Sequence, residues 1–210
     1  LDHDVQFKVL RHEPVYTSQE AARVRGVALA SGANYLAHLG WQKGQRWGRE
    51  VLLPADFPYA KTGLNNPHPL AYWKSLGVRF ANGQAIPDIG MQASVLVPSG
   101  HSGPAFFVYP NFNVILEWNR SEYYALAVGL LADRLIGAGS LVRPPSTREA
   151  ALSRSVIEKM QKQLNQLGYD AGEIDGVMGS MTQSALREFQ SARGMIADGY
   201  PDRQTLCALS

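Results

Sequence analysis

Glycines divide residues 153–210 into short segments, and this division limits what that part of the chain can form. Within each segment the apolar residues recur every three or four positions, which is the spacing of one face of an α-helix. Helices this short bury little surface alone, so they have to pack on one another. We therefore predict a separate module of three short helices. Its predicted core residues are Ile157, Met160, Leu164, Leu167, Ala185, Leu186, Phe189, Leu206 and Leu209.

Polar residues mark where these three helices are expected to begin. Ser155 with Glu158, and Ser180 with Gln183, have the spacing of capping boxes, in which two side chains satisfy the free backbone N–H groups of a first turn. Asp202 is a favourable N-cap residue for the last helix.

The connection between the first two helices reads YDAGEIDGVMGS, where the glycines permit left-handed turns. With its L-x-x-L-G-Y, D-G-x-x-G, T-x-x-A-L-x-x-F-Q and D-G steps, the whole module resembles the peptidoglycan-binding domain found at the ends of many cell-wall hydrolases. The resemblance implies a shallow groove for stem peptide and sugar, with peptidoglycan as the partner. Alternatively, the glycines and aspartates only shape turns. The implied contacts are Tyr169, Asp175, Gly176, Gly179, Thr182, Asp198 and Gly199.

The N-terminal residues predict a strand and then helix. Residues 5–9 alternate between apolar and polar side chains, as a half-buried strand does. Thr17 and Glu20 form a capping box for a helix, and residues 28–39 continue as a second helical stretch that ends at Gly40. The residues expected to face one core there are Leu29, Ala33, Leu36 and Ala37.

Residues 41–115 contain frequent Gly and Pro between short apolar runs, a pattern typical of short strands and turns. The expected strands are the runs 51–53, 95–97, 106–109 and 112–116. Residues 69–76 predict one brief helix, with Leu70, Trp73 and Leu76 on one face.

Residues 121–136 predict a longer helix buried on one side. Its expected inner face is Tyr124, Ala127, Val128, Leu131 and Leu135. The fold class is thus mainly α with a small β insertion (α+β). The interrupted pattern after residue 136 predicts a linker. The expected domains are an N-terminal segment 1–33, a middle region 34–139, a linker 140–152 and the module 153–210.

Composition excludes several classes of function. A net charge of +2 with no Lys/Arg run argues against nucleic-acid binding. No apolar run is long enough to span a membrane, and no secretory leader is recognisable at the start. The five histidines are scattered, so we expect no metal site, and we expect no cofactor. A single cysteine, Cys207, excludes an internal disulfide. We expect a monomer.

Four segments of the middle region carry a second resemblance: ANYLAHLGWQKGQRWG, VLLPADFPYA, LAYWKSLGV and GPAFFVYPNFNVILEWNRSEYYALAVGLLADRL. They are similar to the back half of the catalytic domain of the B-type lytic murein transglycosylases. The resemblance implies a partial lysozyme-like fold and a location in the periplasm or cell envelope. In that family one protonated glutamic acid cleaves the MurNAc–GlcNAc linkage without water and leaves a 1,6-anhydromuramic product.

The motif W-N-R-S-E-Y-Y carries the implied glycan contacts of the middle region. Asn119 is implied to hydrogen-bond the glycan, Tyr124 to line the cleft, and Trp118 to stack on a sugar face. A helix N-cap is the alternative role for Asn119, and helix packing is the alternative for Tyr123 and Tyr124.

The family's catalytic glutamate lies in a helix well upstream of the A-N-Y-L segment, before a G-x-x-Q-F-x-P-S loop, and neither has a counterpart in this sequence. We therefore assign no catalytic residue, and enzymatic activity stays uncertain. The leading hypothesis is a peptidoglycan-binding protein of this family. The alternative is an active lytic transglycosylase that uses Glu117, Glu122 or Glu50 as its acid.

Residues 1–33 carry a third resemblance through FKVLRHEPVYTSQEAARVRGVALASGA, which is similar to the start of the YbaK-type prolyl-tRNA editing domains. The lysine expected after S-G-A is absent, which argues against editing activity. A remnant editing-like module is the third hypothesis. Because L-A-S-G-A fits both families, we expect a junction there, from recombination, engineering or misassembly. The alternative is a divergent transglycosylase N-terminus.

Overall fold

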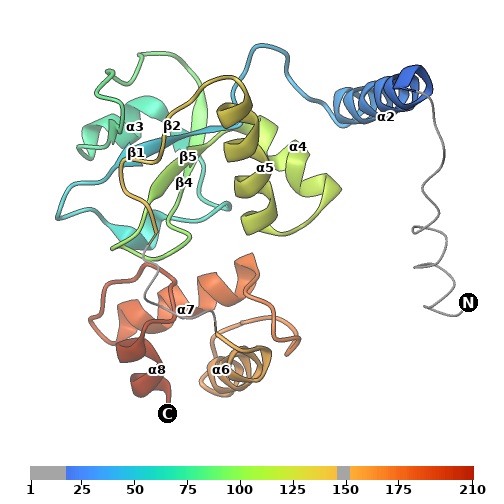
Figure 1. The fold of residues 1–210 in the computed structure, drawn as a ribbon. Coiled ribbons are helices and arrows are strands. Elements are labelled where there is room, and N and C mark those ends of the chain that lie inside the picture. The colour runs from blue at the N-terminus through green and yellow to red at the C-terminus, as the bar shows by residue number, and fades with distance from the viewer. Residues whose placement is uncertain (1–17, 146–151) are drawn as a thin grey trace, which may run out of the picture. The chain divides into compact units, whose positions relative to one another are not determined.

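A computed structural model describes residues 18–145 and 152–210 of the protein (Figure 1). The chain divides into two compact units, Leu1–Trp41 and Gln42–Ser210. The described residues contain seven α-helices, one short 3-10 helix and a small sheet. This content confirms the predicted fold class, mainly α with a small β insertion.

The described part of the first unit is one helix, α2 (Ser18–His38). The prediction of two separate helical stretches was wrong here, because the backbone continues without a break. Gly40, at φ +95°, follows its end as expected. The expected inner face is not buried within the described residues, since Leu29 is 75% exposed. The strand predicted over residues 5–9 and the cap at Thr17 lie outside the described residues.

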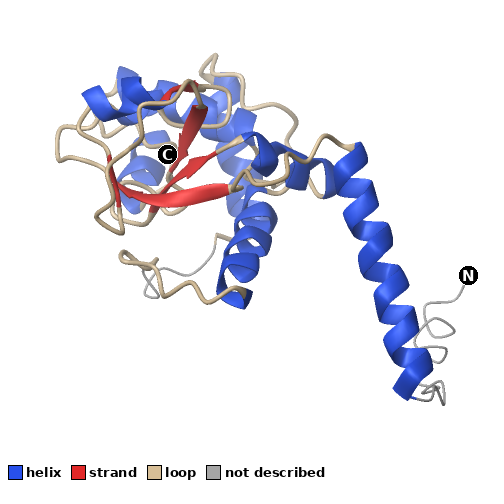
Figure 2. Cartoon of the chain, turned by 90° about the horizontal axis from the view of Figure 1, so that it is seen from above, coloured by secondary structure: helices blue, strands red, loops and turns tan. Residues whose placement is uncertain are grey.

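The second unit contains a five-stranded antiparallel sheet with the strand order β2-β4-β5-β1-β3, drawn in red in Figure 2. The central strands are the most buried: Val95 on β4 lies opposite Phe107 on β5, and neither side chain is exposed. Burial on both faces explains why these strands read as continuous apolar runs. The strands are β1 (Gly48–Leu52), β2 (His68–Pro69), β3 (Arg79–Phe80), β4 (Gln92–Leu96) and β5 (Ala105–Val108).

Three of the four predicted strand runs fall mainly in β1, β4 and β5, but the fourth was wrong. Residues 112–116 belong to a helix, α4 (Pro110–Trp118). Pro110 occupies the first turn, where its missing N–H costs nothing. Phe112 and Ile115, three positions apart, are both buried. A short apolar run does not by itself distinguish a buried strand from a buried helix.

The brief helix predicted over residues 69–76 is confirmed as α3 (Leu70–Ser75). A 3-10 helix, η1 (Tyr59–Lys61), precedes it. Trp73 is completely buried, and its indole Nε1–H donates to the Ala93 carbonyl of β4 at 2.8 Å. This bond satisfies the one polar group that a buried tryptophan carries, so α3 is held against the sheet.

The long predicted helix is α5 (Glu122–Leu135), but its predicted inner face was wrong. The residues that are buried are Ala125, Leu126 and Gly129. The cause is Trp47: its indole lies against Gly129, where any Cβ would overlap the ring. Small residues on α5 let this large ring approach the helix.

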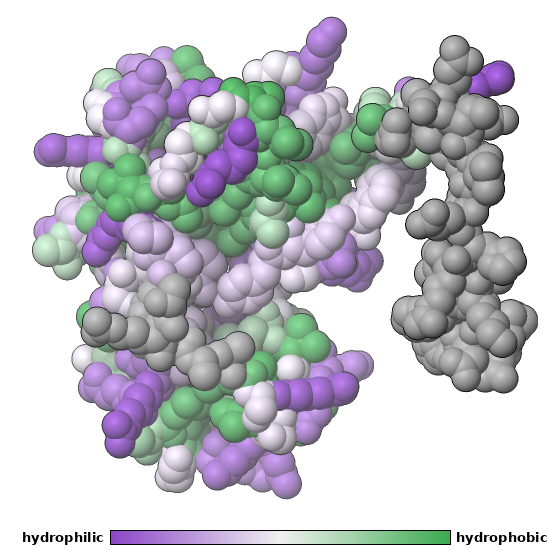
Figure 3. Space-filling view, viewed as in Figure 1, coloured by the Kyte–Doolittle hydropathy of each residue, from purple (hydrophilic) through white to green (hydrophobic). Residues whose placement is uncertain are grey.

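The face of α5 predicted to be buried is largely exposed instead. Leu131 is 60% exposed and Leu135 is 79% exposed. Apolar side chains are visible in green over this helix in Figure 3. Helical periodicity therefore located α5 correctly without identifying which of its faces is buried.

The C-terminal part of the second unit is the predicted three-helix module. Its helices are α6 (Arg154–Gln166), α7 (Ser180–Ala192) and α8 (Arg203–Leu209). Met160, Leu164, Leu186 and Phe189 form the centre of its core, and each is at most 1% exposed. Leu167, also predicted for the core, is 51% exposed because it caps the end of α6.

The predicted capping box of α6 is not formed. The N-cap is Ser153, and the Ser155 hydroxyl bonds to the Ser153 hydroxyl at 3.0 Å rather than to the backbone. The Glu158 carboxylate pairs with Arg154 Nε at 3.0 Å. This i,i+4 ion pair therefore takes the side chain that the capping box requires.

Of the two other predicted N-caps, the one for α7 was wrong and the one for α8 is confirmed. Ser180 is the first residue of α7 and not its cap, because Gly179 holds that position without a side-chain bond. Asp202 caps α8 as predicted, since its Oδ1 accepts the Thr205 N–H at 2.7 Å.

Candidate functional site

The turn between α4 and α5 positions Asn119. Its backbone ends α4, and its Oδ1 accepts the Ser121 N–H at 3.0 Å. The N-cap of α5 is Ser121, whose hydroxyl accepts the Tyr124 N–H at 3.3 Å, so the alternative N-cap role falls to Ser121. Asn119 Nδ2 makes no hydrogen bond to another described residue. This exposed amide group is therefore a free donor.

Asn119 lines a cavity of about 980 Å³, which we call the Asn119 cavity. The cavity lies between the α4–α5 turn and the C-terminal module. Its lining includes Glu117, Asn119, Ser121 and Tyr123 on one side and Gly176, Val177, Gly179 and Ser180 on the other. Residues predicted from two different sequence resemblances thus meet at one hollow.

Two of the predicted glycan contacts do not line this cavity. Trp118 is 52% exposed and Tyr124 is 38% exposed, and both lie outside its lining. The adjacent Tyr123 lines it instead, and its hydroxyl donates to the Pro98 carbonyl at 2.9 Å. Burial raises the pKa of Tyr123, and the nearby Glu122 carboxylate adds to this effect. Tyr123 therefore contributes an aromatic ring to the lining of the cavity.

The glycine-rich connection of the module is organised by one buried glutamine. Gln161 Nε2 donates to Asp175 Oδ1 (2.8 Å), to the Val177 carbonyl (3.1 Å) and to Thr182 Oγ1 (3.1 Å). Its Oε1 accepts the Gly176 N–H at 2.9 Å. The Asp175 Oδ1 also accepts the Val177 N–H at 2.9 Å. We call residues 175–177, together with Gln161 and Thr182, the first D-G turn.

The same arrangement occurs again before α8. Gln190 Nε2 donates to Asp198 Oδ1 (3.2 Å), to the Tyr200 carbonyl (3.0 Å) and to Thr205 Oγ1 (3.1 Å). Its Oε1 accepts the Gly199 N–H at 2.8 Å, and Asp198 Oδ1 accepts the Tyr200 N–H at 2.8 Å. We call residues 198–200, together with Gln190 and Thr205, the second D-G turn.

The predicted module contacts separate into exposed and buried residues. Asp175 and Gly179 are exposed, whereas Gly176, Thr182 and Gly199 are buried. The Thr182 hydroxyl, 2% exposed, donates to the Ala171 carbonyl at 3.1 Å. A buried hydroxyl with its bonds satisfied holds the turn, which is the alternative role for this residue.

Two further predicted contacts are turned toward protein. The Tyr169 ring packs edge-on against Phe189 at 5.8 Å and is part of the module core. Asp198 is 5% exposed, because its Oδ2 accepts the His101 backbone N–H (2.9 Å) and lies 2.7 Å from His101 Nδ1. A carboxylate only accepts, so Nδ1 carries the hydrogen. Asp198 therefore fixes the module to the loop after β4.

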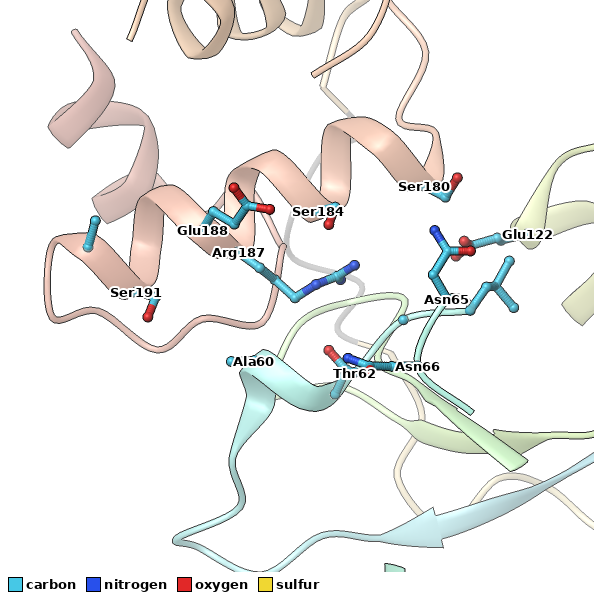
Figure 4. Close-up of a pocket in the computed structure, with 13 residues that line it drawn as sticks. Ala60, Thr62, Asn65, Asn66, Glu122, Ser180, Ser184, Arg187, Glu188 and Ser191 are labelled. Carbon is cyan, nitrogen blue, oxygen red and sulfur yellow. The ribbon is translucent and has the colours of Figure 1, made fainter. Parts of the chain in front are cut away.

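A second cavity of about 530 Å³ lies between α7 and the loop after η1 (Figure 4). Arg187 extends from α7 toward Thr62 and Asn66 in this view. Its guanidinium occupies the space beside Gly63, where a Cβ would lie 2.6 Å from it. Desolvation lowers the pKa of Arg187, and the carboxylate of Glu122 opposes that shift.

The three alternative acids occupy different environments. Glu50 accepts the backbone N–H groups of Val142 (2.9 Å) and Arg143 (2.8 Å), so it holds the chain after α5. Glu117 is exposed at the rim of the Asn119 cavity. Glu122 is largely buried and lines both cavities. Burial raises the pKa of Glu122. A hydrogen bond from Gln183 (3.3 Å) and the charge of Arg187 lower that pKa in part.

Sequence reasoning missed the buried glutamines, His101 and the role of Tyr123. One signal was present: the pattern D-G-x-x-x-x-x-T occurs twice, from Asp175 to Thr182 and from Asp198 to Thr205. The glutamines stand at different distances before these two patterns, so no fixed spacing links them. His101 has no local signal, because its partner lies in another region of the chain.

Comparison with known families identifies both regions. The family described as "Transglycosylase SLT domain" matches residues 25–133. The family described as "Putative peptidoglycan binding domain" matches residues 153–209. The chain belongs to the SLT transglycosylase family and carries a peptidoglycan-binding domain after that region.

Two solved structures of SltB3 resemble the chain over most of its length. The crystal structure of SltB3 from Pseudomonas aeruginosa in complex with NAG-anhNAM-pentapeptide is 47% identical, with a TM-score of 0.79, over 87% of this chain and 49% of that one. The SltB3 complex with NAG-NAM-pentapeptide gives the same identity, TM-score and share of this chain, and 50% of the other. The chain thus spans about half the length of the SltB3 chains. Slt35 from Escherichia coli, in complex with bulgecin A, is 28% identical over 52% and 33% of the two chains, with a TM-score of 0.42.

Other comparisons are negative. No curated protein matches the chain significantly. The resemblance of residues 1–33 to YbaK-type editing domains has no support among these comparisons, and the transglycosylase match already begins at residue 25. Over the two described stretches, every helix is too short or too polar to cross a lipid bilayer. In those stretches, no three His, Cys, Asp or Glu side chains are grouped to hold a metal ion.

Proposed function

We propose that this protein binds peptidoglycan, with glycan in the Asn119 cavity and the C-terminal module as an anchor on the cell wall. The observation that carries the proposal is that Asn119 and the first connection of the module line one hollow of about 980 Å³. Membership of the transglycosylase family and the module's own family both support it. So do the peptidoglycan fragments bound to SltB3. A periplasmic or envelope location follows from this function.

The cavity has the groups that a sugar ligand needs. Asn119 Nδ2 has no acceptor among the described residues, Glu117 is an acceptor at the rim, and Tyr123 supplies an aromatic ring. Sugar recognition commonly combines directional hydrogen bonds with a flat apolar surface, and this set provides both. Trp118 and Tyr124, outside the cavity lining, remain candidate contacts for a longer strand.

The proposed domain limits are those of the sequence prediction, 34–139 for the glycan-facing region and 153–210 for the anchor. The full chain should be titrated with soluble, uncross-linked glycan strands and followed by calorimetry. We expect saturable binding. Cellohexaose, which lacks N-acetyl and lactyl groups, is the control. The proposal would be overturned if the chain bound glycan strands and cellohexaose with equal affinity, or if it bound neither of them.

A second candidate function is cleavage of the glycan, favoured by one observation. Among the three alternative acids, Glu122 is a largely buried carboxyl group with a raised pKa, which is the property of a general acid. The test is release of anhydromuropeptides from purified sacculi, detected by mass spectrometry. Glu122→Gln should abolish release and Glu50→Gln, at a position outside both cavities, should preserve it. No release from the unaltered chain, or equal release from all three chains, rules Glu122 out as the acid.

A further inference from the structure

A second hollow adjoins the Asn119 cavity. It is the cavity of about 530 Å³ between α7 and the loop after η1, which we call the Arg187 cavity. Leu64, Glu122 and Ser180 line both cavities, so the two hollows are neighbours along one groove. The volume lies within the range of roughly 300–1,000 Å³ that is usual for ligand pockets. The groove therefore has room for a ligand that extends beyond Asn119.

The guanidinium group of Arg187 lies in this hollow with its donors unused. Two glycines flank it: a Cβ on Gly63 would lie 2.6 Å from its Nη2, and a Cβ on Gly199 of the second D-G turn would lie 2.7 Å from its Nη1. Figure 4 shows the side chain reaching from α7 toward Thr62 and Asn66. Within residues 18–145 and 152–210, no hydrogen bond or ion pair joins the guanidinium to another group. Its N–H groups are therefore available to a ligand.

The charges around Arg187 favour a neutral ligand over an anion. The carboxylates of Glu122, Asp198 and Glu188 raise the pKa of this arginine, in opposition to desolvation. One positive group thus lies among three negative ones, and Glu122 and Glu188 line the same cavity. An incoming carboxylate or phosphate would be repelled by these two side chains. A neutral acceptor, such as an amide carbonyl, can bond to the arginine without that cost.

Glu122 supplies an acceptor in the same hollow. Its Oε2 accepts a hydrogen bond from Gln183 Nε2 at 3.3 Å, and its Oε1 accepts none from the described residues. A carboxyl group keeps acceptor capacity whether or not it is protonated. Arg187 and Glu122 therefore present a donor and an acceptor to one cavity, and no ion pair joins them in the described part of the chain. A planar group with a carbonyl beside an N–H satisfies both.

The rest of the lining suits a sugar. The Thr62 hydroxyl donates to the Tyr59 carbonyl at 2.7 Å, so its oxygen is left as an acceptor. Leu64 adds an apolar surface where the two cavities meet. The other small polar side chains of the lining are Asn65, Asn66, Ser180, Ser184 and Ser191. Hydroxyl and amide groups of this kind bind hydroxyl-rich ligands through directional hydrogen bonds.

On the basis of the proposed function, we propose that the Arg187 cavity binds the acetamido group of an amino sugar in the glycan strand held at Asn119. Arg187 donates to the acetyl carbonyl, Glu122 accepts the amide N–H, and Leu64 contacts the methyl group. The C-terminal module then takes part in glycan recognition directly, through a side chain of α7, in addition to anchoring the chain. Arg187 is thus a specificity-determining residue for N-acetylated glycan.

The test uses the full chain and two hexasaccharides. Chitohexaose carries an acetamido group on every ring, and cellohexaose carries a hydroxyl group in its place. Neither contains a stem peptide. We expect calorimetry to show saturable binding of chitohexaose alone. Arg187→Lys, which keeps the charge and loses the planar fork, should weaken that binding about tenfold. Arg203→Lys, at an exposed position of α8 outside both cavities, is the matched control.

A second measurement needs no variant. In the isotope-labelled wild type, the Nε–H resonance of Arg187 should shift saturably with di-N-acetylchitobiose and stay in place with cellobiose. Sodium acetate at the same concentrations should leave it unmoved. A shift with acetate as large as that with the disaccharide would show that the cavity takes carboxylates, and would overturn the inference.

Three other results would also overturn it: an Arg187 resonance that ignores the disaccharide, Arg187→Lys binding chitohexaose as the wild type does, or binding of glycan strands without binding of chitohexaose. The resonance measurement decides the matter even if the substitution disturbs the packing against Gly63 and Gly199. Failure of the wild type to bind glycan strands and chitohexaose alike would instead count against the proposed function itself.

Discussion

The Oδ1 of Asn119 accepts the backbone N–H of Ser121 at 3.0 Å, and the same side chain lines the open cavity. One side chain therefore has two separable functions. The acceptor shapes the turn between α4 and α5, and the Nδ2 donor is available to a ligand.

Asn119→Asp tests this separation, because aspartate keeps the acceptor and loses the donor. We expect the free energy of unfolding to change by less than about 0.5 kcal/mol, as for other surface substitutions. Affinity for soluble glycan strands should fall about tenfold. Asn82→Asp is the control for binding, since Asn82 Oδ1 accepts the Gln84 N–H (3.1 Å) and the residue lies outside the Asn119 cavity; its Nδ2 also donates to Gln84 Oε1 (2.9 Å), so the comparison is limited to affinity. Equal loss of binding in both variants would contradict the assignment.

Gly129→Ala should strongly destabilise the second unit, because the added methyl overlaps the Trp47 ring and the core cannot rearrange without displacing the indole. Overpacking of this kind costs about 1–3 kcal/mol. Urea unfolding monitored by tryptophan fluorescence measures the loss. Gly26→Ala on α2, where a Cβ meets nothing within 4 Å, should be neutral or stabilising. A stable Gly129→Ala variant would show that this contact is looser than described.

Tyr109 should make stability fall in alkaline solution. Burial raises its pKa to about 12, against an ordinary value of 10.0. Between those pH values the unfolded chain loses this proton and the folded chain keeps it. The free energy of unfolding then decreases with rising pH, by up to about 1.4 kcal/mol per pH unit for one proton. Tyr109→Phe should show a shallower decrease in urea unfolding between pH 10 and 11.5, and an unchanged slope would refute the assignment.

His101→Ala should loosen the attachment of the module. It removes the ring donor to Asp198 and keeps the backbone donor, so we expect a loss of about 1 kcal/mol in the free energy of unfolding. His101 is itself partly exposed, which keeps the expected loss small. Amide exchange at Gly199 and Tyr200 should accelerate. His38→Ala, at an exposed position of α2, is the control. Identical exchange in both variants would argue against a docking role.

The sequence indicated the module more fully than the middle region. Apolar positions at helical spacing gave the three helices of the module, because helices this short have few ways to pack. In the middle region the same reasoning found α5 but selected the wrong face, since the contact with Trp47 depends on a residue far away in the sequence. It also took residues 112–116 of α4 for a strand, because a short apolar run fits both structures.

The candidate site was predictable only in part. Asn119 and Asp175 were identified from motifs, and both are exposed where a ligand could reach them. The hydrogen bond between His101 and Asp198 was not predictable, because it depends on how the loop after β4 packs against the C-terminal module. The roles of Gln161 and Gln190 were also hard to predict from the sequence. Their hydrogen-bond partners are mainly backbone groups and short polar side chains, which also occur in ordinary turns.

The most direct measurement is sedimentation of the full chain with purified insoluble peptidoglycan over a range of concentrations, with soluble muropeptides as competitors. The account predicts saturable binding that the competitors reverse, and no retention on insoluble cellulose. Recovery of the folded chain entirely in the supernatant, or equal retention on both polymers, would contradict it.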